Sequence, residues 1–317
     1  IGGFILAIAI ERWNLHKRIA LNIIQLIGTN VKNVILGFMV ATAFLSMWIS
    51  NTATSVMMLP IGMSIISQLM DNPKTVENEN QNFGKALMLA IAYSASIGGM
   101  ATLIGTPPNL VLATIVQETY GIEITFSKWF MFGLPISLIL LAICWKYLTE
   151  IAFTFKQKKF PGGRNEINKQ LKSLGKLSYE EKMVLLIFVG TAFAWITRSF
   201  LLQKLIPNLD DTIIAVIAGI LLFILPASKS KNRKLINWEE AVKLPWGILL
   251  LFGGGLALAQ GFKTSGLAEW IGGQLTLLEG ASIFILLLFL IALVNFLTEI
   301  TSNLATTAMI LPILAPL

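Results

Sequence analysis

Two short polar segments interrupt long apolar stretches of this 317-residue chain. Residues 50–54 read Ser-Asn-Thr-Ala-Thr, and residues 302–306 read Ser-Asn-Leu-Ala-Thr. At the start of a helix, the first amides have no intrahelical partner and the positive end of the helix dipole attracts anions. Ser, Asn and Thr side chains can cap such amides in a bilayer and still offer polar atoms to a ligand. Each segment is therefore a candidate site for a small anion, with a helix expected to begin at Thr52 and at Leu304.

The two polar segments belong to a longer internal repeat. At one constant spacing Ser302 aligns with Ser50, and the Leu-Pro-Ile that follows each segment aligns as well. Chance matching of apolar residues does not readily explain a shared polar motif inside apolar flanks. We interpret the stretches 33–70 and 281–317 as two related re-entrant hairpins. The legs of the first are also long enough for two full spans, so length alone leaves both interpretations open.

The two hairpins are predicted to enter the membrane from opposite sides. An odd number of predicted crossings separates them, namely 86–116, 126–147, 183–202, 212–227 and 245–262. The basic loops 146–182 and 228–243 both fall on the cytoplasmic side in this count, which agrees with the positive-inside rule. Inverted repeats with interrupted helices are typical of secondary transporters. The predicted fold class is therefore an all-α membrane protein, an inverted-repeat secondary transporter with two re-entrant hairpins and interrupted helices.

The composition is that of a multi-pass membrane protein. The hydrophobic share is 55%, the charged share is 13% and the mean hydropathy is +0.75, whereas soluble domains carry about 25% charged residues. The net charge of +7 comes from basic residues in short loops, which argues against nucleic-acid binding. The single Cys144 lies in an apolar span, and the sequence holds no metal-ligand cluster, so we expect no enzyme and no cofactor. His16, in a basic interfacial segment, is expected to be solvated.

A stretch rich in glycine and proline, 98–109, interrupts the crossing 86–116. Pro107 and Pro108 lack amide hydrogens and cannot continue a helix, while the glycines let the backbone turn and approach closely. The carbonyls freed by such a break are oxygen donors that can bind Na⁺ beside Ser and Asn side chains. The alternative interpretation is a plain proline kink, a common feature of membrane helices.

At these residues the sequence resembles the divalent anion/sodium symporter family. The motifs that carry the resemblance are Ser50-Asn51-Thr52, Gly105-Thr106-Pro107-Pro108-Asn109 and Thr298-Glu299-Ile300-Thr301-Ser302-Asn303. The resemblance covers the whole chain and implies a homodimer in which a mobile transport domain moves against a scaffold by an elevator motion. It also implies import of succinate-like di- or tricarboxylates with several Na⁺ ions. We expect an integral protein of the bacterial inner membrane.

The resemblance implies roles for individual residues. Ser46, Ser50, Asn51 and Gly99 look like a first sodium site, and Thr298, Thr301 and Asn303 look like half of a second. The residues that look like contacts of the substrate carboxylates are Asn51, Thr52, Ser302 and Asn303. Leu304 stands where many dicarboxylate carriers have Thr, which removes a hydroxyl donor and keeps sulfate open as the anion.

The predicted organisation is one membrane domain, 1–317. Its parts are a first transport part, 1–118, with hairpin 33–70 and broken helix 86–116, scaffold-type spans and basic loops in 119–244, and the start of a second transport part, 245–317, with hairpin 281–317. The stretch 71–85 is predicted to be a cytoplasmic loop and 263–279 an external segment. Because no second glycine–proline break follows the second hairpin, we expect this chain to be a fragment that lacks both ends of a longer carrier.

Three classes of function remain open. The first is a sodium-coupled dicarboxylate symporter, and the second is a sulfate carrier or sodium-independent anion exchanger of the same fold. The third is a proton-driven antiporter, an arsenite-type efflux pump or a channel. Proton coupling usually needs buried acidic or histidine relays. Glu299 is the one acid well inside an apolar region near a polar segment, and it either couples transport or supports the segment by pairing with a hydroxyl or backbone group.

Overall fold

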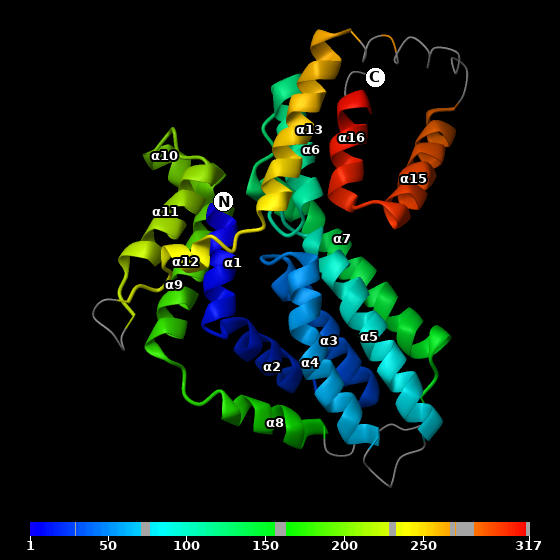
Figure 1. Cartoon of the computed structure of the whole chain (residues 1–317). Helices are drawn as coiled ribbons and strands as arrows, with labels where there is room; N and C mark the ends of the chain where they lie inside the picture. The colour runs from blue at the N-terminus through cyan, green and yellow to red at the C-terminus, as the bar shows by residue number, and fades with distance from the viewer. Residues whose placement is uncertain are drawn as a thin grey trace. The chain divides into compact units, whose positions relative to one another are not determined.

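The computed structural model describes residues 1–28, 30–70, 77–155, 163–227, 233–266, 270 and 282–314. Most of these residues are helical, and they form no β-strand beyond isolated bridges such as the one between Pro226 and Lys234. The predicted all-α class is therefore confirmed. The chain forms two compact units (Figure 1). Unit one comprises Ile1–Thr106 with Thr125–Leu244, and unit two comprises Pro107–Ile124 with Pro245–Leu317.

Unit one contains the first hairpin and the longest apolar helices. Its helices are α1 (Gly2–Arg12), α2 (Leu15–Ile27), α3 (Val31–Ser46), α4 (Asn51–Met70), α5 (Glu77–Gly99), α7 (Phe126–Lys146), α8 (Gly163–Ser173), α9 (Tyr179–Thr197), α10 (Gln203–Leu205), α11 (Asp211–Ile224) and α12 (Trp238–Ala241). The π-helical segments η1 (Tyr147–Ala152) and η2 (Arg198–Leu202) continue α7 and α9. Thr125, Ser178 and Asp210 start α7, α9 and α11 by accepting hydrogen bonds from first-turn amides.

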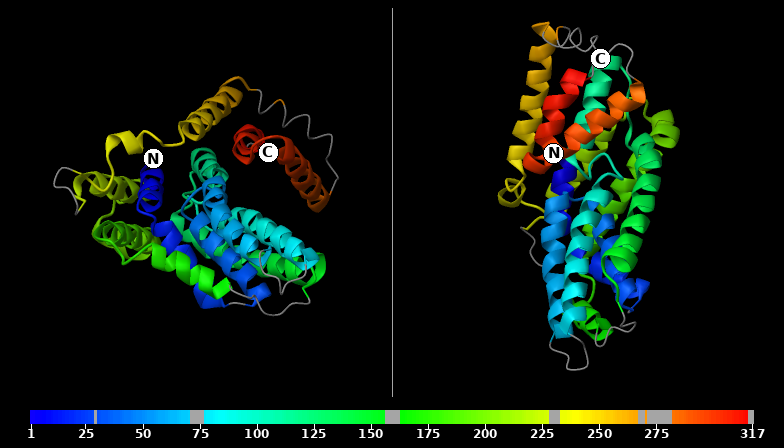
Figure 2. Two further views of the ribbon diagram at one scale, coloured as in Figure 1. Left: turned by 60° about the horizontal axis from the view of Figure 1, so that its bottom comes forward. Right: turned by 90° about the vertical axis from the view of Figure 1, so that its right-hand side faces the viewer.

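One apolar core holds the first hairpin in place. It joins α2, α3, α4 and α5, and Ile24, Phe38 and Leu87 are completely buried in it. Gly37 permits the close approach of α3 to α2, because a Cβ there would lie 3.1 Å from the Ile24 Cα. Figures 1 and 2 show α3, α4 and α5 running alongside one another. Both legs of this hairpin are therefore covered by other helices of unit one.

Unit two is smaller and contains the second hairpin. It is built from α6 (Pro107–Tyr120), α13 (Trp246–Thr264), α15 (Ile283–Ile300) and α16 (Asn303–Leu314). α16 packs against α6 and α13, and a buried apolar cluster of Val111, Ile115 and Leu304 lies between α6 and α16. α15 is much less covered, with Phe296 76% and Ile300 87% exposed.

Both hairpins contain a helix break at the polar segment, as predicted. α3 ends at Ser46 and α4 begins at Asn51, while α15 ends at Ile300 and α16 begins at Asn303. Each second leg starts one residue earlier than predicted, because the serine before the asparagine serves as the N-cap. The re-entrant path of the hairpins stays a prediction.

The prediction that residues 71–85 form a loop was wrong for the second part of this stretch. α5 already begins at Glu77, and Asn80 and Phe83 are 4% and 2% exposed. Tertiary packing of this face overrides the weak helix propensity of an asparagine-rich sequence. Residues 71–76 lie outside the described residues, as does most of the predicted external segment 263–279.

The predicted helix interruption is present. α5 ends at Gly99 and α6 begins at Pro107, which occupies the first helical position, where a missing amide hydrogen costs nothing. Gly121 follows the end of α6 with a φ of 68°, and its amide bonds to the Gln117 carbonyl at 3.0 Å. The break separates two well-formed helices and is more than a kink.

Two described helical stretches, Phe126–Ala152 and Tyr179–Leu205, are long and apolar enough to cross a membrane. Shorter apolar helices are Val31–Ser46, Asp211–Ile224, Trp246–Gly255 and Leu287–Ile300. Only 22% of the apolar window of Phe126–Ala152 is buried, and α7 exposes Met131, Phe132 and Ile139. An exposed apolar helix surface of this kind suits contact with lipid.

Candidate functional site

The predicted site residues lie at the turns of the two hairpins. We call residues 46–54 the first tip and residues 298–306 the second tip. With Gly99, these two segments contain every predicted contact of Na⁺ and substrate. The first tip belongs to unit one and the second to unit two.

Ser50 caps the helix that begins at the first tip. Its hydroxyl accepts a hydrogen bond from the Ala53 amide at 3.3 Å, and its carbonyl accepts one from the Thr54 amide at 2.9 Å. The amides of Asn51 and Thr52 have no hydrogen-bond partner within the described part of the chain. The first tip therefore presents two amides at the positive end of α4, an arrangement that can bind a carboxylate.

Oxygen atoms gather behind the first tip. The hydroxyl of Ser46, a completely buried residue, lies 2.9 Å from Asn51 Oδ1 and 2.6 Å from the Ala95 carbonyl oxygen. The side-chain oxygen of Asn51 and the Ala95 carbonyl oxygen both accept, and both lie within hydrogen-bond distance of the one Ser46 hydroxyl. Such an excess of acceptors suits a cation, because the oxygen ligands of Na⁺ need no hydrogen. The structure thus brings together Ser46 and Asn51, two of the residues predicted for the first sodium site.

The glycine loop between α5 and α6 closes around the same oxygens. Gly99 lies so close to Asn51 that an added Cβ would overlap the side-chain oxygen. At Gly105 a Cβ would lie 2.6 Å from the Gly99 carbonyl oxygen and 2.8 Å from the Ser46 carbonyl oxygen. Only glycine fits at both positions, so Gly99 lies against the Asn51 side chain, and the carbonyl oxygens of Gly99 and Ser46 lie against Gly105. That this cluster binds Na⁺ stays a prediction.

Thr102, which the sequence analysis did not single out, attaches this loop to the first tip. Its hydroxyl donates to the Met47 carbonyl at 2.5 Å and accepts from the Gly105 amide at 3.0 Å. The residue is completely buried. The sequence signal for this role was a hydroxyl residue inside a glycine-rich helix break, because a short polar side chain there can form hydrogen bonds with the backbone groups of the loop.

The second tip repeats the cap of the first. The Ser302 hydroxyl accepts from the Ala305 amide at 3.0 Å, and its carbonyl accepts from the Thr306 amide at 2.9 Å. The amides of Asn303 and Leu304 make no hydrogen bond to any part of the chain that the structure describes. Both tips therefore present the same pair of open amides at a helix N-terminus.

The residues predicted to form half of a second sodium site are less closely connected than those of the first. Thr298 Oγ1 donates to the Asn295 carbonyl at 2.9 Å, and Thr301 Oγ1 donates to the Leu297 carbonyl at 2.9 Å. Both hydroxyls therefore bond to their own helix α15, while Asn303 is exposed. Among the described residues, no hydrogen bond joins Thr298 to Asn303 in the way that one joins Ser46 to Asn51.

A buried threonine supports each tip from the second leg, and neither threonine was among the predicted site residues. Thr54 and Thr306 are each completely buried, four residues after the capping serine. Thr306 Oγ1 lies 2.5 Å from Thr301 Oγ1 and must be the donor, because Thr301 already donates to a carbonyl. Thr54 Oγ1 reaches the Ile49 carbonyl at 3.5 Å. The sequence signal that could have identified these two residues was the threonine at the same position in both copies of the repeat.

Leu304 and Glu299 lie differently from what their sequence context suggested. The Leu304 side chain is 7% exposed and packs with Val111 and Ile115, so only its amide is open at the second tip. Glu299 is exposed and forms no hydrogen bond or ion pair with the described residues. Pairing of Glu299 with a hydroxyl or backbone group behind the second tip is therefore not observed.

Comparison with known proteins assigns a family. The profile described as the sodium:sulfate symporter transmembrane region matches residues 1–317. A sodium-dependent dicarboxylate transporter of Staphylococcus saprophyticus is 50% identical over 322 aligned residues. Transporters of the same name from Staphylococcus aureus strains USA300 and NCTC 8325 are each 51% identical over 322 residues. In each comparison the alignment covers 100% of this chain and 62% of the relative, so the relatives are longer than this chain.

Proposed function

Because the chain belongs to the sodium:sulfate symporter family, a family of integral membrane transporters, we propose that it imports a small dicarboxylate together with Na⁺. The observation that carries this proposal is the first tip. There, the oxygens of Ser46 and Asn51 and the open amides of Asn51 and Thr52 occur within a few residues of each other. A cation site and an anion site that share Asn51 give a direct physical reason for coupled binding.

The open amides favour an anionic substrate. Each tip offers two amides at the positive end of a helix, at Asn51 and Thr52 in one unit and at Asn303 and Leu304 in the other. Each pair of amides matches one carboxylate, which supports a substrate that carries carboxylates, such as succinate. In this proposal Leu304 contributes its backbone amide, so the missing threonine hydroxyl does not argue against a dicarboxylate.

Sodium is proposed to bind at both tips. The first ion is assigned to Ser46, Ser50, Asn51 and Gly99, with backbone oxygens supplied by the glycine loop. The second is assigned to Thr298, Thr301 and Asn303. These ions neutralise charge near the substrate, so a doubly negative anion can enter a low-dielectric region at lower cost.

We further propose an elevator mechanism in a homodimer of a bacterial plasma membrane. Residues 1–118 and 245–317 are assigned to the moving transport part, and residues 119–244 to the scaffold. The exposed apolar surface of α7 supports contact with lipid or with a second protomer. The inverted repeat supports alternating access, because related halves can exchange two mirrored conformations.

Uptake measurements test the function directly. The protein, expressed from its complete gene, is reconstituted in liposomes, and uptake of labelled succinate and labelled sulfate is followed with an inward gradient of Na⁺ or of choline. We expect succinate uptake that needs Na⁺ and is competed by other dicarboxylates. Sodium-driven sulfate uptake without succinate uptake, or succinate exchange that ignores Na⁺, would contradict the proposal.

A further inference from the structure

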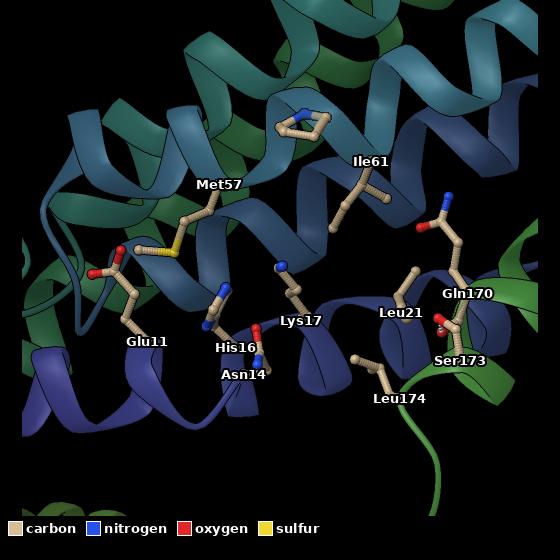
Figure 3. A pocket seen from close by; sticks show the side chains of 11 residues that line it. Glu11, Asn14, His16, Lys17, Leu21, Met57, Ile61, Gln170, Ser173 and Leu174 are labelled. Carbon is tan, nitrogen blue, oxygen red and sulfur yellow. Dashed lines mark hydrogen bonds between the residues drawn. The ribbon is translucent and has the colours of Figure 1, made fainter.

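An open cavity of about 580 Å³ lies in unit one, and none of the residues that line it belongs to the first tip. It is bounded by the junction of α1 and α2, by the second leg α4 and by α8 (Figure 3). The residues that line it are Glu11, Asn14, His16, Lys17, Leu21, Met57, Pro60, Ile61, Gln170, Ser173 and Leu174. Its volume is within the range of about 300–1,000 Å³ that is typical of sites for small ligands.

His16 gives this cavity a fixed hydrogen-bond acceptor. It is 3% exposed, so the expectation that it is solvated was wrong. Its Nδ1 lies 3.2 Å from the Ile10 carbonyl oxygen, which can only accept, so the proton is on Nδ1. Burial, with Lys17 nearby, lowers the pKa of His16, and the ring is neutral at pH 7. Nε2 is left as an unprotonated acceptor without a partner among the described residues.

The other polar groups at the α1–α2 junction are also unpaired. Glu11, Asn14 and Lys17 are exposed, and their side chains form no hydrogen bond or ion pair with the residues that the structure describes. Asn14 has a φ of 56°, so the chain turns sharply there and brings the end of α1 beside the start of α2. Figure 3 shows Lys17 beside His16, extending from α2 into the cavity. One ammonium group, one carboxylate and one neutral acceptor thus line the same cavity.

The opposite wall offers little to a polar ligand. Gln170 already donates to Ser64 and Glu166, and the Ser173 hydroxyl donates to the Gln170 carbonyl at 2.7 Å. Leu21, Met57, Pro60, Ile61 and Leu174 make the rest of this wall apolar. The cavity therefore has one polar end with unpaired groups of both signs and one apolar side.

Two features indicate that the cavity lies at the level of the membrane surface. Trp13, whose indole donates to the Leu235 carbonyl at 2.9 Å, stands between α1 and α2, and tryptophan marks the interface between membrane and water. α2 buries Leu15, Leu21 and Ile24 against other helices of unit one and exposes Lys17 and Asn22, so it is an amphipathic helix of the kind that can lie along a membrane surface. Lipids with acidic headgroups are available at this level in the cytoplasmic leaflet of a bilayer.

We propose that this cavity binds a phospholipid whose headgroup combines a phosphate with hydroxyl groups, such as phosphatidylglycerol. Lys17 binds the phosphate, and the headgroup hydroxyls donate to Glu11 and to Nε2 of His16. Acyl chains lie against the wall formed by Met57, Ile61 and Leu174. The lipid connects the first hairpin to α2 and α8. This proposal depends on membrane insertion and is independent of which anion is transported.

Lipid binding to the purified protein, produced from its complete gene, tests the proposal. Delipidated protein in neutral detergent is titrated with phosphatidylglycerol or phosphatidylcholine and observed by native mass spectrometry and thermal unfolding. We expect phosphatidylglycerol to bind about tenfold more tightly, because phosphatidylcholine has no headgroup donor for Glu11 and His16. Lys17→Ala is expected to weaken phosphatidylglycerol binding about tenfold, because a charged hydrogen bond is lost.

A second variant and a matched control make the test decisive. Ser173→Trp fills the cavity from an exposed position and is expected to abolish the preference for phosphatidylglycerol. Lys172→Ala removes the same charge from an exposed α8 residue outside the cavity and is expected to bind like the unmodified protein. Unchanged binding in Lys17→Ala or in Ser173→Trp would overturn the proposal. So would displacement of the lipid by free glycerol phosphate at a comparable concentration, which would identify a soluble ligand.

Discussion

The two tips have nearly the same sequence and the same cap, yet their surroundings differ. In each tip a serine accepts hydrogen bonds from two backbone amides, and two further amides at the start of the helix have no partner among the described residues. Behind the first tip, Ser46, Asn51 and the glycine loop gather oxygens in a buried position. Behind the second tip, the two predicted sodium-site threonines bond to their own helix.

This difference shows that the open amides and the oxygen cluster have different structural origins. The open amides depend on the capping motif alone, so both copies have them wherever the motif occurs. The oxygen cluster depends on a second element, the loop after α5, which approaches the first tip through Gly99 and Gly105. We infer that anion recognition is a property of each tip, whereas the first cation site also uses oxygens of the broken-helix loop beside its tip.

This comparison assumes that the two tips enter the membrane from opposite sides. A test of that orientation has the largest expected effect. After Cys144→Ala, we expect single cysteines at Gln81 and at Thr264 to react with impermeant reagents from opposite sides, in an all-or-none manner. Both positions are exposed, whereas Asn80 beside Gln81 is buried. Labelling of both positions from the same side would rule out inverted repeats.

Removing the asparagine should abolish transport at either tip. Asn51→Ala and Asn303→Ala each remove a proposed contact of both Na⁺ and carboxylate. Two charged hydrogen-bond contacts, each worth about 1.5–3 kcal/mol, correspond to a loss of at least about 100-fold in uptake. Asn22→Ala, which changes an exposed asparagine on α2, is the control with expected normal uptake. Normal uptake by Asn303→Ala alone would show that the second tip contributes no substrate contact.

Gly105→Ala should affect the first tip through its oxygen cluster. The added methyl group would lie 2.6 Å and 2.8 Å from two backbone oxygens, so the loop must shift. We expect sodium-driven uptake to fall about 10- to 100-fold while the protein still inserts and binds detergent normally. Gly190→Ala is the matched control, because a Cβ there meets no atom within 4 Å. If Gly105→Ala retains its apparent sodium affinity, the loop oxygens do not bind the ion.

The buried threonines should have smaller and unequal effects. Thr306→Val removes the donor to Thr301, and we expect the apparent affinity for Na⁺ to fall about fivefold, the value of one hydrogen bond. Thr54→Val removes only a 3.5 Å contact, so its effect should remain below about twofold. Sodium dependence of succinate uptake measures both, and Thr306→Ser should restore the affinity. Equal effects of the two valine variants would show that the tips are supported alike.

Leu304→Thr should have the smallest effect on transport. Its side chain packs between α6 and α16 and its amide is retained in the variant, so we expect an unchanged preference for succinate over sulfate. Thermal unfolding should show a loss of about 1–3 kcal/mol from the polar group placed in an apolar cluster. A shift toward another anion would show instead that residue 304 faces the substrate.

The helix breaks and caps of this protein were determined by local sequence. Pro107 begins α6, and Ser50 and Ser302 begin the second legs within one residue of the predicted positions, because proline chemistry and capping act over a few residues. Hydropathy likewise identified most apolar helices, since transfer into lipid depends on composition. The family resemblance rested on these same local motifs.

The arrangement around the tips was decided by tertiary structure. Ser46 meets Ala95 from 49 positions away, and no local pattern states that this pair closes an oxygen cluster. Burial of His16, the inward direction of Leu304 and the extension of α5 to Glu77 also depend on which helices pack together. The physical reason is that capping depends on neighbours along the chain, whereas ligand geometry and burial depend on distances that only packing sets.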